Sequence, residues 1–199
     1  IKAVENHKGG IPMKILSIAI PCYNSEAYME KCIESLLKGG EEVEILVVND
    51  GSSDRTAEIA DAYAEKYPTI IKAIHQENGG HGEAVNAGIR NATGLYFKVV
   101  DSDDWVETNM MEEMLKEAAG IPGEVICGNF VIEKDGHSTS HFHELSPGIY
   151  EGALLENSIK RNLLGNERRT ISMSRCMKLF SRELIVDNMI YCNPGIKMG

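Results

Sequence analysis

The sequence predicts an α/β domain in which helices flank a mostly parallel sheet. Two observations lead to this fold class: short apolar runs alternate with segments of helical periodicity, and the runs are too continuously apolar for strands with one exposed face. Connections of this strand–helix–strand kind place successive strands parallel to one another.

The apolar runs and the helical stripes follow one another in a regular order. The run at 14–21 predicts a buried strand that stops at Pro21. The next elements are a helix at 25–38, a strand at 43–48, a helix at 57–64, a strand at 69–74, a short helix within 78–93 and a strand at 95–100. Beyond them we expect a helix at 108–119, a strand at 124–133 and a helical segment at 151–164, whereas 171–191 mixes strand and helix signals.

Length and charge limit the classes of function. With 199 residues the chain can bury a sizeable core without disulfides or a structural metal. The 30 Asp and Glu residues against 20 Lys and Arg give a net charge of -10, which repels phosphate backbones and makes nucleic acid an unfavourable partner. We therefore expect no nucleic-acid binding.

The cysteines and the apolar runs bear on location. No apolar run reaches the roughly 18 residues of a transmembrane helix. The five cysteines are scattered and odd in number, which is typical of reduced core residues in a cytosolic protein: Cys22, Cys32, Cys127, Cys176 and Cys192. We expect a cytoplasmic chain without a transmembrane segment, in which residues 1–12 are a leader or added segment ahead of Met13.

Polar residues gather where three predicted strands end. In an open parallel sheet, ligands bind outside the carboxyl ends of the strands. Carboxylates that meet there repel one another unless a cation lies between them, and Mn²⁺ or Mg²⁺ with oxygen ligands would also attract the phosphates of a nucleotide diphosphate. The residues at these strand ends are Tyr23, Asn24, Asn49, Asp50, Asp101, Ser102, Asp103 and Asp104.

Each of these motifs has a simpler structural interpretation. Asp and Ser clusters are common in turns and at helix starts, so either acidic loop could be structural. His81 lies between glycines facing the same edge, where a phosphate or sugar contact is plausible. The sequence around it is not a dinucleotide fingerprint, because Val85 stands where a small residue belongs. Three further histidines, His137, His141 and His143, include an alternating pair that fits a metal site or a solvated strand edge.

Three segments, taken in order, closely resemble the family 2 glycosyltransferases with the GT-A fold. They are SIAIPCYNSEAYMEKCIESLL, VEILVVNDGSSDRTAEIA and ENGGHGEAVNAGIRNATGLYFKVVDSDDW. The resemblance implies a metal-dependent transfer of a sugar from a nucleotide diphosphate donor, usually UDP-linked, to a hydroxyl with inversion at the anomeric carbon. It also implies a saccharide or glycolipid acceptor and a place in bacterial polysaccharide or glycolipid synthesis.

The resemblance also implies residue roles. Pro21, Tyr23 and Asp50 would hold the base, with Tyr23 stacking on it and Asp50 accepting a hydrogen bond from a ring nitrogen. Asp103 and Asp101 would be the DXD carboxylates that bind Mn²⁺ or Mg²⁺, with Asp101 closer to the ribose. The implied donor site is completed by Asn24, Glu26, Gly80, His81, Asn86, Ser102 and Asp104, the last of them toward the donor sugar.

By the same resemblance, residues 13–105 form the nucleotide-sugar-binding half and residues 106–199 the acceptor-side half, which we expect to be incomplete. The family's general base is usually an Asp in a Glu-Asp pair after a glycine-containing segment, so we expect it beyond Gly199, together with any part that associates with the inner face of the membrane. Val85 departs from the family, since many relatives carry Arg there.

Two other functions stay open at this stage. A nucleotidyltransferase would share the α/β pattern, but it would need a triphosphate loop rich in glycine and basic residues after the first strand, and this sequence has none. A noncatalytic nucleotide-sugar-binding module would explain the absence of a recognisable base. Sugar transfer after restoration of the segment beyond residue 199 would exclude the binding module.

Overall fold

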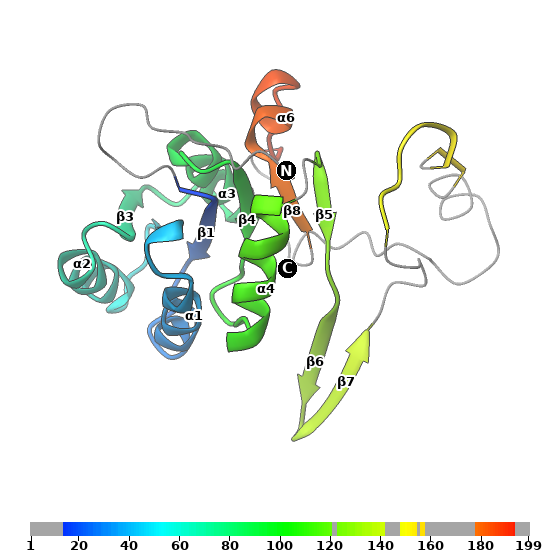
Figure 1. The fold of residues 1–199 in the computed structure, drawn as a ribbon. Helices are drawn as coiled ribbons and strands as arrows, with labels where there is room; N and C mark the ends of the chain where they lie inside the picture. Colours follow the sequence, from blue (N-terminus) through cyan, green and yellow to red (C-terminus); the bar gives the residue numbers. More distant parts are fainter. Residues whose placement is uncertain (1–13, 121–122, 142–147, 155, 158–177, 194–199) are drawn as a thin grey trace. The chain divides into compact units, whose positions relative to one another are not determined.

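The structure is a computed structural model that describes residues 14–120, 123–141, 148–154, 156–157 and 178–193. The chain divides into two compact units, one of residues 1–126 with 179–199 and the other of residues 127–178. A six-stranded sheet with the order β3-β2-β1-β4-β8-β5 organises the first unit (Figure 1). The second unit contains the hairpin of β6 (Phe130–Lys134) and β7 (His137–His141).

Most of the large sheet is parallel. Its strands are β1 (Leu16–Cys22), β2 (Val43–Asp50), β3 (Ile71–Gln76), β4 (Tyr96–Val99), β5 (Val125–Cys127) and β8 (Lys178–Ser181). Strand β1 pairs in parallel with β2 and β4, β2 pairs in parallel with β3, and β8 is antiparallel to β4. The helices are α1 (Met29–Leu36), α2 (Thr56–Lys66), α3 (His81–Asn91), α4 (Thr108–Gly120) and α6 (Arg182–Asp187), with a 3₁₀ helix η1 (Leu37–Glu42). The predicted fold class is confirmed.

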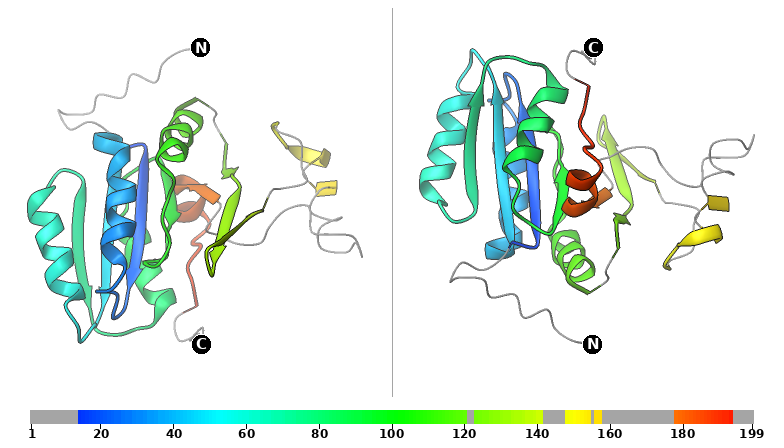
Figure 2. Two further views of the ribbon diagram at one scale, coloured as in Figure 1. Left: turned by 90° about the horizontal axis from the view of Figure 1, so that it is seen from below. Right: turned by 90° about the horizontal axis from the view of Figure 1, so that it is seen from above.

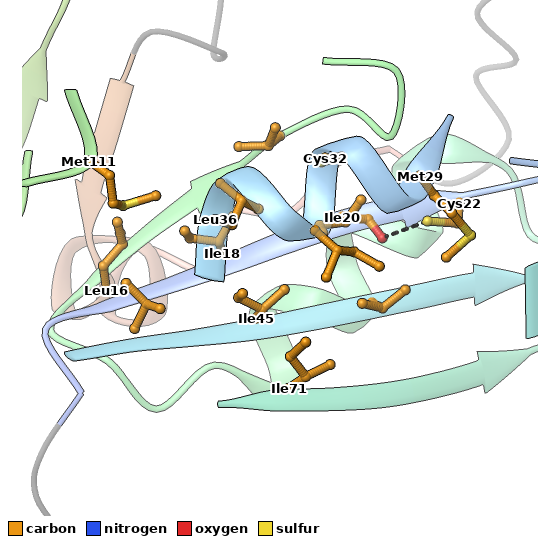
Figure 3. Packing of buried hydrophobic residues seen from close by; sticks show 14 of the residues in the cluster. Leu16, Ile18, Ile20, Cys22, Met29, Cys32, Leu36, Ile45, Ile71 and Met111 are labelled. Carbon is orange, nitrogen blue, oxygen red and sulfur yellow. Dashed lines mark hydrogen bonds between the residues drawn. The ribbon is translucent and has the colours of Figure 1, made fainter. Parts of the chain in front are cut away.

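Helices cover both faces of the sheet, so the first unit has three layers (Figure 2). Alternate side chains of a strand point to opposite faces. On one face Leu16, Ile18 and Ile20 pack with α1, α2 and α4 (Figure 3). On the other face Ala19 packs with Val85 and other residues of α3 and α6. Strand β1 is buried along all seven residues, as its continuous apolar run predicts.

Strand β1 continues through Pro21, where the sequence predicted its end. The Ala19 carbonyl accepts a hydrogen bond from the Val100 amide at 3.0 Å, so the backbone groups of Ala19 face β4. Pro21, two residues further along the strand, directs its backbone groups to the same side. Pairing with β4 ends at Ala19 and Val99. Since a proline has no N–H to donate, it is tolerated at the position where this ladder has ended.

Other predicted boundaries were wrong. The strand expected at 124–133 is two strands, β5 and β6, which pair in different sheets. Helix α1 begins at Met29 and changes to a 3₁₀ turn at Leu37, and β3 begins at Ile71, two residues later than expected. The mixed signals of 171–191 match β8 and α6 within the described part. Residues 1–12 and most of 151–164 lie outside the described residues.

The cysteines agree with the prediction only in part. Cys22 and Cys32 are buried, and burial raises the pKa of the Cys22 thiol to about 12. Cys192 is half-buried, whereas Cys127 is exposed, so the expectation of a core residue was wrong at Cys127 because β5 leaves this side chain outside the core. These four cysteines are free, and Cys176 lies outside the described residues. Among the described helices, none is long and apolar enough to cross a membrane.

Close contact between α3 and β1 gives a first test. A Cβ added at Gly88 would lie 2.5 Å from the Ala19 Cβ, closer than real contacts allow. We expect Gly88→Ala to lower the free energy of unfolding by about 1–3 kcal/mol, since α3 must move away from the sheet. Chemical denaturation measures the change. Gly120→Ala, where a Cβ meets nothing within 4 Å, is the control, and equal effects of both changes would contradict this packing.

Candidate functional site

The candidate site lies where the order of strands reverses. From β1 the chain continues to β2 and β3 on one side of β1, and β4 then pairs on its other side. Because these four strands are parallel, their carboxyl ends lie at one edge of the sheet. An edge of this kind, at a reversal of strand order, is where open α/β sheets bind ligands. The predicted residues of the loops after β1, β2 and β4 are therefore brought together.

The Asp50 carboxylate at the end of β2 is fixed by three donors. Its Oδ1 accepts from Gln76 Nε2 at 2.7 Å and from the Gly79 amide at 2.8 Å. Its Oδ2 accepts from the Gly80 amide at 2.8 Å. Asp50 is 3% exposed. Because each carboxylate oxygen can accept about two hydrogen bonds, Oδ2 retains capacity for one further donor.

Two glycines allow this arrangement. Gly51 (φ 70°) and Gly80 (φ 85°) have backbone angles that side chains disfavour. A Cβ on Gly51 would also lie 2.8 Å from the Asn78 amide nitrogen. The loop after β2 and the loop before α3 can therefore approach one another around Asp50.

Asn24 connects the loop after β1 to the loop after β2. Its side-chain oxygen accepts a hydrogen bond from the Ser53 backbone amide at 2.9 Å, and its backbone amide donates to Ser52 Oγ at 3.0 Å. Asn24 has a positive φ of 50°, which Asn tolerates better than most residues. The Tyr23 side chain beside it is 54% exposed, and the ring is available to stack on a planar ligand.

Glu26 strengthens the same connection. Its Oε2 accepts from the Arg55 amide at 3.0 Å, and its amide donates to Asp54 Oδ2 at 3.1 Å. The structure therefore shows Glu26 holding the loop after β2, while Pro21 is buried at the end of β1. A direct role of Glu26 or Pro21 in ligand binding stays a prediction.

A pair of buried hydroxyls connects the loop after β1 to the loop after β4. The second of these, residues 101–106, is called the acidic loop below. Ser25 Oγ and Ser102 Oγ are 3.0 Å apart, and the Ser25 amide donates to Thr56 Oγ1 at 2.7 Å. Ser102 is 9% exposed. The hydroxyl of Ser102 is therefore engaged inside the protein, where it fixes the acidic loop, and its role in donor binding stays a prediction.

Helix α1 holds the rest of the acidic loop. Lys31 Nζ lies 2.9 Å from the centroid of the Trp105 ring, a cation–π contact. Ser35 Oγ accepts from the Val106 amide at 3.1 Å, and Cys32 Sγ donates to the Asp101 carbonyl at 3.7 Å. Sequence reasoning missed these contacts, although Lys31 and Ser35 are spaced for one face of a helix.

The carboxylates of this loop remain close to one another. Asp103 and Asp104 are exposed and Asp101 is half-buried. Partial burial and the nearby charges of Asp103 and Asp101 raise the pKa of Asp104, while Lys98 acts in the opposite direction. This concentration of negative charge is the property that a cation would neutralise.

His81 joins the acidic loop to α3. It is the first residue of α3, and its Nε2 lies 3.5 Å from Asp101 Oδ1. Gly80 immediately precedes it and bonds Asp50, so His81, expected near a phosphate or sugar, meets the acidic loop next to the contact with β2. Asn86, one turn further along α3, is 3% exposed and bonds to Glu83 and to the backbone of Cys192.

Of the three histidines at 137, 141 and 143, the structure describes the side chain of His137, which lies in the second unit. His137 is exposed on β7 and lines a shallow hollow on the hairpin together with Ile132, Lys134, Asp135 and Thr139. The His141 side chain and all of His143 lie outside the described residues. Within the described part of the chain, no group of three or more His, Cys, Asp or Glu side chains is arranged to hold a metal ion.

Comparison with known proteins decides the family. The model of the glycosyl transferase family 2 matches residues 17–187, which is most of the chain. The chain belongs to this family. It is 35% identical over 149 residues to the glycosyltransferase GlyA of Streptococcus pneumoniae, covering 74% of this chain and 21% of GlyA. It is 41% identical over 123 residues to EpsJ, an uncharacterised glycosyltransferase of Bacillus subtilis, covering 61% of this chain and 36% of EpsJ.

Solved structures confirm the GT-A fold of this family 2 member. The crystal structure of S. aureus TarS 1–349 has a TM-score of 0.70 and 25% sequence identity, covering 93% of this chain and 52% of the TarS chain. TarS 1–349 in complex with UDP-GlcNAc also has a TM-score of 0.70 with 25% identity, covering 90% of this chain and 49% of that one. The family 2 chain thus spans about half of TarS 1–349 and less than half of GlyA and EpsJ.

The interaction between the carboxylates of Asp103 and Asp104 in the acidic loop can be tested. Because Asp103 raises the pKa of Asp104, we expect Asp103→Asn to lower the pKa of Asp104 toward its ordinary value. Titration of the Asp104 carboxyl carbon by NMR measures this shift. Glu58→Gln on α2 removes an equal charge outside the acidic loop and should leave Asp104 unchanged. An unaltered Asp104 titration in Asp103→Asn would show that the two carboxylates do not interact.

Proposed function

We propose that this chain is the donor-binding part of an inverting glycosyltransferase. It would transfer a sugar from a UDP-sugar to a hydroxyl of a saccharide or glycolipid in bacterial polysaccharide or glycolipid synthesis. Family membership supports sugar transfer, and the similarity to TarS, which was crystallised with UDP-GlcNAc, supports a UDP-sugar as donor. The bacterial relatives support the setting.

The observation that carries the proposal is the fixed Asp50 carboxylate at the end of β2, whose neighbour β1 is followed directly by the exposed Tyr23. A uracil ring presents one N–H in its plane and two flat faces. Asp50 Oδ2 accepts one of the about two hydrogen bonds that a carboxylate oxygen can take, and Tyr23 offers an exposed aromatic ring after the end of β1. Asp50 would therefore accept a hydrogen bond from the ring N–H, and Tyr23 would stack on the uracil. Pro21, near the end of β1, would help to hold the same ring.

Asp101 and Asp103 would hold the metal ion, Mn²⁺ or Mg²⁺. Such ions are commonly bound through one or two carboxylates together with the phosphates of the substrate, so a site without three protein ligands fits this chemistry. Partial burial, and then the charges of Asp103 and Asp101, raise the pKa of Asp104, and a cation in the acidic loop would relieve the repulsion between these carboxylates. When bound, the ion would stabilise the diphosphate as it leaves. His81, the first residue of α3, would contact a phosphate or the sugar, and Gly80 would border the donor with its amide bonded to Asp50.

The remaining steps depend on the sugar and the acceptor. Glycosyl transfer passes through a transition state with oxocarbenium character, and a hydroxyl attacks from the face opposite the leaving diphosphate. Asp104 would lie toward the donor sugar. The attack also needs a base within hydrogen-bond reach of the acceptor hydroxyl, and this proposal assigns no described residue to that role.

The alternative functions find less support. In the structure the loop after β1 contains Tyr23, Asn24 and Glu26 and no basic side chain, unlike a triphosphate loop. This observation disfavours a nucleotidyltransferase. A noncatalytic binding module would have the same donor contacts, so transfer of a labelled sugar, and not donor binding, distinguishes it from an enzyme.

The metal contribution can be measured by calorimetric titration of UDP in the presence of Mn²⁺ or EDTA. We expect UDP to bind at least about tenfold more tightly with Mn²⁺, and we expect Asp103→Ala to abolish this difference because a metal ligand is lost. Asp135→Ala in the β6–β7 hairpin is the matched control and should behave like the unaltered chain. Failure of the unaltered chain to bind UDP, GDP or dTDP under either condition would overturn the proposed function.

The base contact is tested separately with Asp50→Asn. This change keeps the side-chain volume but removes the charge that accepts the ring N–H, so UDP affinity should fall by about tenfold or more, equally with Mn²⁺ and with EDTA. Circular dichroism checks that the variant is folded. Unchanged affinity in a folded Asp50→Asn chain would contradict the assigned role of Asp50.

A further inference from the structure

The Asn86 side chain binds the segment of residues 190–193, which lies beyond α6. It bonds both backbone groups of Cys192, the amide and the carbonyl. Its Nδ2 donates to the Cys192 carbonyl at 2.9 Å, and its Oδ1 accepts from the Cys192 amide at 2.7 Å. This pair of bonds joins residues 106 positions apart in the chain. Because both backbone groups of Cys192 are bonded, Asn86 fixes the position and the orientation of this residue, as a neighbouring strand would.

These bonds use the hydrogen-bond donors of Asn86. A side-chain amide has two N–H donors. One bonds Cys192, and the other donates to Glu83 Oε2 at 3.1 Å, while Glu83 Oε1 accepts from Arg90 at 2.6 Å. Asn86 is 3% exposed. A diphosphate presents only acceptors, so Asn86 in this arrangement has no hydrogen to offer it.

Gly82 allows the same segment to lie against the first turn of α3. A Cβ at this position would be 3.2 Å from the Asn193 carbonyl oxygen and 3.2 Å from the Cys192 Cβ, a distance tighter than most real contacts. The neighbouring residue on that turn is His81, whose Nε2 is 3.5 Å from Asp101 Oδ1. Residues 190–193 are therefore held against the helix turn that borders the proposed donor site.

We propose that Asn86 is a positioning residue, not a ligand of the donor phosphates, and that the segment 190–193 forms one border of the donor site. The first part rests on the contacts of Asn86 alone, whereas the second rests on the proposed function. Tyr191, next to Cys192 in this segment, is 48% exposed. The role of Asn86 is to hold the segment in place.

The test combines hydrogen exchange with UDP binding. Exchange is followed by mass spectrometry in peptides that cover residues 188–193, with and without UDP and Mn²⁺, and UDP affinity is measured on the same samples. The variant is Asn86→Ala. The matched control is Asn91→Ala, which makes the same change on the same helix at a residue whose bonds go to Lys72 and Ala87.

In the ligand-free chain, we expect Asn86→Ala to speed exchange of the Cys192 amide by at least about tenfold, since its acceptor is removed. UDP with Mn²⁺ should slow exchange of residues 188–193 in the unaltered chain and in Asn91→Ala, and this slowing should disappear in Asn86→Ala. Any fall in UDP affinity should come only together with the faster Cys192 exchange, because Asn86→Ala loosens a border of the donor site and removes no donor contact of its own. A purely structural role would not remove the ligand-dependent slowing.

Gly82→Ala is a second variant in case Asn86→Ala does not fold. Its added Cβ displaces the segment while leaving the Asn86 side chain in place, and we expect the same gain in exchange at residues 188–193. Unchanged exchange of Cys192 in folded Asn86→Ala would overturn the positioning role, and unchanged exchange at residues 188–193 in folded Gly82→Ala would overturn the border role. A tenfold loss of UDP affinity in Asn86→Ala with unchanged Cys192 exchange would instead make Asn86 a donor ligand.

The two proposals fail in different ways. If the unaltered chain binds no UDP, the proposed function and the border role fall together, while ligand-free exchange still decides whether Asn86 positions Cys192. If UDP binds but does not slow exchange at residues 188–193 in the unaltered chain, the proposed function stands and the border role is wrong.

Discussion

Burial of β1 between two parallel neighbours is the constraint on which the rest of the structure depends. All seven residues of the strand are buried, and β2 and β4 pair with its two sides. Helices must then cover both faces of the sheet, and the loops after these strands must leave from one edge. Ser25 and Ser102 bond across the reversal of strand order, and Asn24 bonds the loop after β2. The site is therefore a consequence of the sheet.

The sequence was sufficient for features that depend on local pattern. Continuous apolar runs predicted the four parallel strands, and the polar residues that follow them lie at one edge of the sheet, as expected. The end of β1 was misplaced because Pro21 stands where the ladder to β4 has already ended. The strand at 124–133 was wrong because an apolar run does not show that its two halves pair in different sheets.

Contacts between residues distant in sequence could not be predicted in this way. Gln76 lies beyond the expected end of its strand, so its bond to Asp50 depends on the parallel register of β2 and β3. The contacts of Asn86 depend even more on residues distant in sequence. The resemblance placed Asn86 at the donor, while its side-chain amide bonds Glu83 and a residue 106 positions away. The spacing of α3 places Asn86 on the buried face, but nothing in that spacing identifies Cys192 as its partner.

The central claim is that the carboxyl edge of β1, β2 and β4 binds the nucleotide of the donor. Two-dimensional ¹⁵N–¹H NMR of the labelled chain during addition of UDP and Mg²⁺ tests it most directly, since each backbone amide reports on its own surroundings. The account predicts that the largest shifts occur at Tyr23, Gly80 and Asp103 and that His137 in the hairpin stays unchanged. Shifts centred on the hairpin, or none at the edge of the sheet at saturating UDP, would contradict it.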